Sequence, residues 1–148
     1  MISHSKGGSV ANKLKLIQWA MNEYERISNK KTNKFVLNNV IKACSTCGIE
    51  SDPALGQQAF HIASTAFTKL HKNSDGKVQS DSFSYYFFMK ACSTLLQHDN
   101  KKLNIILKTF DLCRKYGHVS KEVMKQMKLS IPSEYFREIQ KEMNNSKN

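Results

Sequence analysis

Hydrophobic residues recur every three or four positions along most of this chain, which is the spacing of amphipathic helices. In the first such stretch, Leu14, Ile17, Met21 and Tyr24 form one stripe with 3-4-3 spacing. The same pattern, together with its polar breaks, predicts helices over residues 9–27, 34–47, 52–71, 81–97, 100–116, 120–129 and 133–143. We therefore expect an all-α fold with essentially no strand.

Polar residues suited to N-capping stand where three of these helices begin: Asp52, Asp81 and Ser120. Pro53 follows the first of them at the first helical position, where its missing backbone N–H would have had no partner in the helix. Two glycines stand just past predicted helix ends, where a left-handed cap is favourable: Gly48 and Gly117.

The stretch from Ala54 to Thr68 carries no formal charge and has apolar residues on two of its sides. A helix of this kind is covered by neighbours on both sides, so we expect it in the middle of the fold. The predicted core consists of Leu37, Val40, Ile41, Cys44, Ile62, Ala66, Tyr85, Phe88, Met89, Cys92, Ile106 and Phe110.

One segment of the chain occurs twice. The residues Lys42–Thr46 read Lys-Ala-Cys-Ser-Thr and return unchanged as Lys90–Thr94, 48 positions later, and upstream Phe35 aligns with Phe83. Self-similarity at such a period is typical of arrays of stacked helical hairpins. We predict one helical-repeat domain over residues 9–143, between a disordered lead (1–8) and a disordered tail (144–148). Its parts are units near 34–80 and 81–117 and capping helices at 120–129 and 133–143.

Two segments resemble the opening of a pentatricopeptide repeat, in which a Tyr-Asn-x-Leu-Ile-like sequence begins the first helix: Leu37–Cys44 and Asp81–Cys92. The resemblance covers about Phe35–Tyr116, although the period here is longer than the roughly 34–35 residues of this family and the related tetratricopeptide repeats. It implies a right-handed α-solenoid of about three helical hairpins. It also implies a non-catalytic module that binds single-stranded RNA. The alternative is protein–protein scaffolding, the common work of tetratricopeptide relatives.

The resemblance also implies particular contacts. Base reading in the family relies on a small polar residue two positions after the Tyr-like one, and Asn39 occupies that position. Its counterpart Phe87 cannot read a base by hydrogen bonding, so it either stacks on a base or packs in the hairpin interface. Lys42 and Lys90 occupy equivalent positions and are suited to backbone phosphates. The expected RNA-binding residues are Asn38, Asn39, Lys42, Tyr86, Phe87 and Lys90.

The net charge of +11 favours a polyanionic partner, and its alternative interpretation is a Lys-rich solvated surface. Eight basic residues lie between Lys101 and Lys128 and seven in the first 34 residues, so positive charge gathers at both ends of the array. This distribution suits phosphate contacts and equally suits soluble capping of a solenoid. No apolar run approaches the ~18–20 residues of a membrane helix, so no membrane partner is expected.

Neither catalysis nor metal binding is expected. Cys44–Cys47 is a C-x-x-C, which is compatible with a redox pair or half of a zinc site. However, the counterpart of Cys47 in the second unit is Leu95, which favours a core position for both thiols. The chain also lacks a nucleophile elbow, a phosphate-binding glycine loop and a carboxylate pair. We predict no enzyme activity, no cofactor and no metal site.

The four cysteines follow no regular framework, which indicates a reducing, intracellular compartment. The family resemblance implies the mitochondrion or the chloroplast. The first nine residues lack both the apolar segment of a secretory signal and the arginine of a transit peptide, which leaves a processed or truncated chain open.

Overall fold

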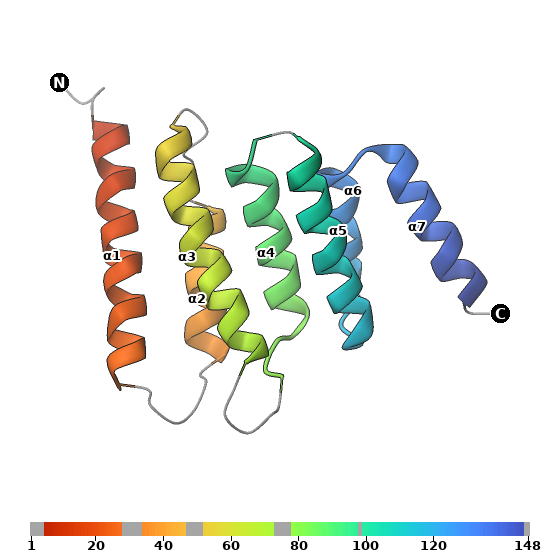
Figure 1. The fold of residues 1–148 in the computed structure, drawn as a ribbon, viewed down its shortest axis with the longest axis horizontal. Helices are drawn as coiled ribbons and strands as arrows, with labels where there is room; N and C mark the ends of the chain where they lie inside the picture. Colours follow the sequence, from red (N-terminus) through yellow and green to blue (C-terminus); the bar gives the residue numbers. More distant parts are fainter. Residues whose placement is uncertain (1–4, 28–33, 47–51, 73–77, 98, 147–148) are drawn as a thin grey trace.

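The computed structural model describes residues 5–27, 34–46, 52–72, 78–97 and 99–146 of the chain. These described residues form seven α-helices and no strand, so the predicted all-α class is confirmed. The helices are α1 (Ser5–Ile27), α2 (Lys34–Ser45), α3 (Pro53–His71), α4 (Ser82–Leu95), α5 (Asn100–Lys115), α6 (Lys121–Ser130) and α7 (Ser133–Ser146). Figure 1 shows the array extending along the long axis of the molecule, with α1 at one end and α7 at the other.

The helix bounds differ from the predicted ones mainly at the two ends of the chain. α1 begins at Ser5 and α7 continues to Ser146, so residues 5–8 and 144–146 are helical where the sequence predicts disorder. Adding residues to an existing helix avoids the unfavourable nucleation step, so polar or glycine-containing ends can extend it. α4 ends at Leu95, earlier than predicted. Some predicted features lie outside the described residues, namely 1–4, Cys47, Gly48, 147–148 and the side chain of Tyr24.

All three predicted N-caps are confirmed. The carboxylate of Asp52 accepts hydrogen bonds of 3.1 and 3.2 Å from two backbone N–H groups in the first turn of α3. Asp81 and Ser84 form a reciprocal capping box at the start of α4. The hydroxyl of Ser120 caps α6 by accepting a hydrogen bond of 3.1 Å from the backbone N–H of Val123. Gly117 follows α5 with φ of 74°, the left-handed conformation expected of a residue that ends a helix. Local sequence therefore fixes these helix ends.

Three of the helices contact one another in series, and other helices pack against this row. α2, α4 and α6 form the row, in which α4 contacts both of the others. α3 packs against α1, α2 and α4, which agrees with the prediction for the helix that is apolar on two sides. In Figure 1, α2 and α6 lie behind α3 and α5. The row therefore belongs to one layer of the molecule.

Every residue of the predicted core is buried, from Leu37 in α2 to Phe110 in α5. Aromatic rings fill the contact between α3 and α4. Phe67 stacks on Phe88 with ring centroids 4.1 Å apart and an interplanar angle of 7°, and it meets Tyr85 edge-on at 5.6 Å. Such pairs add to the stabilisation that burial provides, so they hold α3 and α4 in a defined geometry.

A polar cluster is buried beside these rings. The Tyr85 hydroxyl lies 2.9 Å from Nε2 of His71 and 2.8 Å from Oγ of Ser80, while Nδ1 of His71 lies 2.9 Å from the carbonyl oxygen of Phe67. That carbonyl can only accept, so Nδ1 carries the proton and Nε2 accepts from Tyr85. Burial lowers the pKa of His71 and raises the pKa of Tyr85 to about 12, so both side chains are neutral at pH 7.

The start of α3 lies close to the end of α4. A methyl group added to Gly56 would lie 3.0 Å from the carbonyl oxygen of Leu95, which is tighter than nearly all real contacts of this kind. Glycine, which has no side chain, therefore permits this close approach of the two backbones.

Candidate binding surface on α2 and α4

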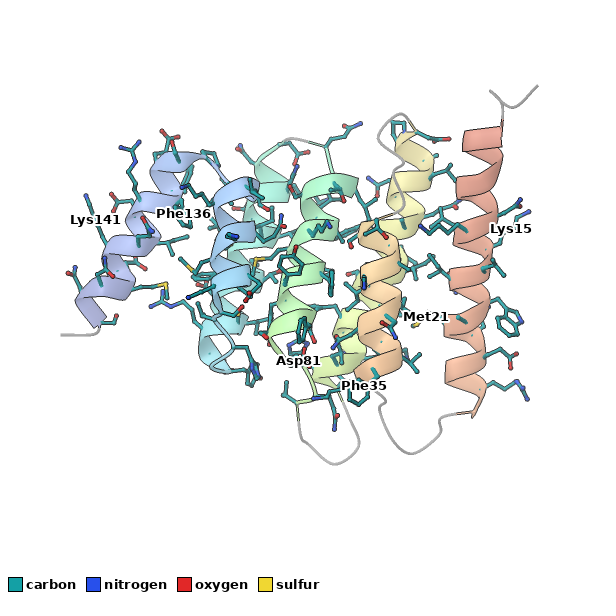
Figure 2. All side chains as sticks on the ribbon, turned by 180° about the vertical axis from the view of Figure 1, so that it is seen from behind. Lys15, Met21, Phe35, Asp81, Phe136 and Lys141 are labelled. Atoms are coloured by element: carbon teal, nitrogen blue, oxygen red, sulfur yellow. The ribbon has the colours of Figure 1, made fainter. Side chains whose placement is uncertain are left out.

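α2 and α4 run side by side in the same direction. Near their beginnings, the ammonium group of Lys34 lies 3.6 Å from the carboxylate of Asp81. Near their ends, the hydroxyl of Thr94 donates a hydrogen bond of 3.3 Å to the carbonyl oxygen of Ser45. Figure 2 shows Phe35 and Asp81 at the same end of the two helices. Because contacts at both ends fix the register, positions that are equivalent in the repeat lie on one face of the pair.

One side-chain hydrogen bond recurs in the two copies of the duplicated segment. The hydroxyl of Thr46 donates to the carbonyl oxygen of Lys42 at 3.2 Å, and the hydroxyl of Thr94 donates to that of Lys90 at 2.9 Å. The two copies of the segment therefore share this bond, although Thr46 directly follows α2 and Thr94 lies within α4.

Asn38 is engaged between the helices. Its amide nitrogen donates a hydrogen bond of 3.2 Å to the carboxylate of Asp81, and its amide oxygen accepts one of 2.7 Å from the hydroxyl of Ser84. Both ends of the side chain are thus bound to the capping box of α4. Among the six residues expected at the RNA site, this one has a structural partner that the sequence did not indicate.

Lys42, Phe87 and Tyr86 lie together. The Nζ atom of Lys42 lies 5.6 Å from the centroid of the Phe87 ring, and this contact crosses from α2 to α4. Phe87 in turn meets Tyr86 in a T-shaped arrangement with centroids 5.0 Å apart. Both aromatic side chains are half-buried and pack against the hydrophobic core, as the interface interpretation of Phe87 predicts. Their remaining surface lies beside an exposed cation.

The other two expected residues lie on the same face. Asn39 is exposed one turn before Lys42, and Lys90 is half-buried one turn after Phe87. On each helix these residues belong to a stripe with 4-3-4 spacing, which keeps side chains on one side of a helix. We call them the α2 stripe (Phe35, Asn39, Lys42, Thr46) and the α4 stripe (Phe83, Phe87, Lys90, Thr94); each position of one is equivalent to a position of the other.

The first position of each stripe was not expected at the site. Phe35 is 71% exposed and Phe83 is 61% exposed, although both are large apolar side chains. The sequence alignment paired them without indicating their exposure. The available signal was helical position, since the neighbours that face the core, Leu37 and Tyr85, lie two residues further along each helix.

One lysine predicted to contribute to the basic surface between Lys101 and Lys128 is buried instead. Lys102 is only 3% exposed, and its ammonium group donates a hydrogen bond of 2.7 Å to the carbonyl oxygen of Ser93 in the last turn of α4. Burial lowers the pKa of Lys102. Lys125 and Lys128, in contrast, are exposed on α6. The basic surface therefore persists without Lys102.

The described cysteines have the character of core residues. Cys44, Cys92 and Cys113 are buried and form no disulfide, and burial raises the pKa values of Cys92 and Cys113 to about 12. A thiol that stays protonated is a poor nucleophile and a poor metal ligand. Within the described part of the chain, no group of three or more His, Cys, Asp or Glu residues is placed to hold a metal ion. The C-x-x-C motif itself is not tested, because Cys47 is outside the described residues.

The helices in the described ranges do not combine the length and apolar character that crossing a membrane requires. No family model, no curated protein and no solved structure matches this chain.

Proposed function

We propose that this chain is a non-catalytic helical-repeat module that binds single-stranded RNA on the α2 and α4 stripes. The observation that carries the proposal is the contact between Lys42 and Phe87, which joins the two stripes through a cation beside an aromatic ring. Single-strand binders combine these two elements, because cations meet the phosphates and aromatic faces meet the bases. The net charge of +11 favours the same kind of partner.

We further propose that the fold is a right-handed α-solenoid of the pentatricopeptide or tetratricopeptide type. Its hairpins would be α2 with α3, α4 with α5, and α6 with α7, and each of these pairs is in contact. The serial contacts of α2, α4 and α6 support this arrangement, since the first helices of successive hairpins adjoin in such arrays. By the same resemblance, the protein would work in the mitochondrion or the chloroplast.

The chemistry divides among the side chains. Lys42 and Lys90 contact backbone phosphates, and the exposed amide of Asn39 offers both a donor and an acceptor to a base edge. Tyr86 and Phe87 present the uncovered parts of their rings to a base. Asn39 is the only side-chain amide among the eight stripe positions, so sequence preference should be weak.

The test is a salt titration of the affinity for a single-stranded oligouridine, starting near about 50 mM salt. The wild type should bind with a linear log–log dependence, and Lys42→Ala/Lys90→Ala should reduce the slope by about 1.4, twice the value for one phosphate. A matched control is Lys101→Ala/Lys141→Ala, which removes the same charge from exposed positions outside the stripes. Equal loss in both double variants would contradict a site on α2 and α4.

The second candidate is a protein–protein scaffold. One observation favours it: Leu16 and Trp19, which lie on one side of α1, are 68% and 62% exposed. Exposed apolar residues that adjoin one another are typical of surfaces that bind proteins. If the wild type does not bind RNA at low salt, RNA binding is rejected and the protein–protein scaffold becomes the favoured function.

A further inference from the structure

We infer that Phe35 and Phe83 are stacking platforms for two bases of the bound strand. This inference rests on the proposed function and extends its site by one helical turn, toward the beginnings of α2 and α4. Neither ring was among the residues expected from the sequence or implied by the family resemblance.

An exposed phenylalanine ring occurs once on each of the two helices. A single exposed phenylalanine on a surface requires no explanation. Here two of them occupy equivalent positions in adjacent parallel helices, and each is more than 60% exposed. The core does not need these rings, since Leu37 and Tyr85 fill it from the same turns and are fully buried.

Each ring occupies the first position of its stripe. Phe35 lies one turn before Asn39, and Phe83 lies one turn before Phe87. The lysine of each stripe follows one turn later. Each helix therefore presents an exposed aromatic ring, a central residue and a lysine in line, and the two lines lie side by side.

An ion pair lies beside the ring of Phe35. The Nζ atom of Lys34 lies 5.5 Å from the centroid of the Phe35 ring and 3.6 Å from the carboxylate of Asp81. The carboxylate holds the cation close to one face of the ring. The high exposure of Phe35 leaves ring surface open to a base. Asp81 largely neutralises Lys34, so the phosphate contacts stay with Lys42 and Lys90.

α6, the third helix of the row, has no residue equivalent to Phe35 and Phe83, so two stacking rings are expected. Counted from the N-caps Asp81 and Ser120, the position of Phe83 in α4 corresponds to Glu122 in α6, and that of Lys90 corresponds to Leu129. A carboxylate at the ring position repels phosphate, and a leucine cannot neutralise one. The strand should therefore be held across α2 and α4.

The experiment compares two single-stranded probes of about ten nucleotides, an oligouridine and an abasic strand with the same phosphates. Phe35→Ala/Phe83→Ala should bind oligouridine roughly 30-fold more weakly than the wild type, since each stack contributes at least about fivefold. Its affinity for the abasic strand and its salt slope should stay unchanged. Phe35→Trp/Phe83→Trp should retain oligouridine binding, because a larger ring still stacks.

The matched control is Leu129→Ala, which removes an exposed apolar side chain from the same row and should leave both affinities unchanged. Suppose that Phe35→Ala/Phe83→Ala binds oligouridine as tightly as the wild type while Lys42→Ala/Lys90→Ala binds it more weakly. This result would overturn the stacking role of Phe35 and Phe83 and leave the proposed function standing. An equal loss for the abasic strand would also overturn the stacking role, because the rings would then act on the backbone. Failure of the wild type to bind either probe would overturn both proposals and favour a protein partner.

Discussion

The side-chain amide of Asn38 donates a hydrogen bond of 3.2 Å to the carboxylate of Asp81, and this bond ties α2 to the N-cap of α4. The hydroxyl of Ser84, in the first turn of α4, donates back to the same asparagine at 2.7 Å. The pair of bonds fixes how the two helices align along their length. That alignment brings Lys42 to Phe87. The proposed binding surface therefore depends on a residue that does not itself need to touch a ligand.

Replacing Asn38 with alanine should therefore destabilise the fold. The variant removes two hydrogen bonds and leaves the capping box of α4 with fewer partners, at an expected loss of about 1–3 kcal/mol in the free energy of unfolding. Asn39→Ala is the matched control, because that side chain is exposed and should change stability by no more than about 0.5 kcal/mol. Urea denaturation of both variants measures the difference. Equal stability of the two would contradict the structural role of Asn38.

A second pair of variants tests the aromatic core. Phe88 is 4% exposed and stacks on Phe67, so Phe88→Ala should lower the free energy of unfolding by about 3–5 kcal/mol. Phe83→Ala removes the same atoms from an exposed position of the same helix and should change stability by less than about 0.5 kcal/mol. The readout is again chemical denaturation. A loss below about 1 kcal/mol for Phe88→Ala would show that this ring is not packed as described.

Lys102 should stabilise the fold through its buried ammonium group. Lys102→Met keeps most of the aliphatic stem but leaves the carbonyl oxygen of Ser93 without this donor at the end of α4. The expected loss is about 1–3 kcal/mol, the usual effect of an unsatisfied buried acceptor. Lys101→Met, at the exposed neighbouring position, is the control. If the two methionine variants unfold at the same denaturant concentration, the buried hydrogen bond contributes nothing.

Stability should also depend on pH through His71. Burial lowers the pKa of this side chain below the 6.5 of an unfolded histidine, so between the two values the unfolded chain binds more protons. The free energy of unfolding should therefore be highest above pH 6.5 and should fall as the pH drops through 6.5 toward the lower folded pKa. His71→Gln should flatten this part of the profile. An identical profile for variant and wild type would assign the dependence to other groups.

Much of the fold is readable from the sequence because its determinants are local. The N-caps at Asp52, Asp81 and Ser120 depend on the chemistry of one residue beside a helical stretch. The core residues follow from the 3.6-residue period, which selects one face of each helix. The equivalence of the two lysines followed from the duplicated segment alone. Lys42 and its neighbours could thus be predicted as a group before their contacts were known.

Other features could not be predicted from the sequence, because they depend on which helices contact one another. The sequence predicts Asn38 as a surface residue, but α4 places the carboxylate of Asp81 within hydrogen-bonding distance of its side chain. The sequence likewise predicts Lys102 as part of a basic surface, but its ammonium group donates to the carbonyl oxygen of Ser93 in α4. A lysine can be buried when its amine finds an acceptor, and sequence does not reveal that acceptor. The contacts of Asn38 and Lys102 thus arise between helices. The exposure of Phe35 and Phe83 is a different case, because apolar rings are expected in a core although helical position places these two away from it.

The central claim is that single-stranded RNA occupies the face shared by α2 and α4. Its most direct test is lysine acylation footprinting by mass spectrometry, with the protein free and saturated with oligouridine. The claim predicts that RNA slows acylation of Lys42 and leaves the rate unchanged at Lys141, whose side chain is 74% exposed on α7 and which Figure 2 shows far from Phe35. Unchanged acylation of Lys42 in the presence of saturating RNA would contradict the claim.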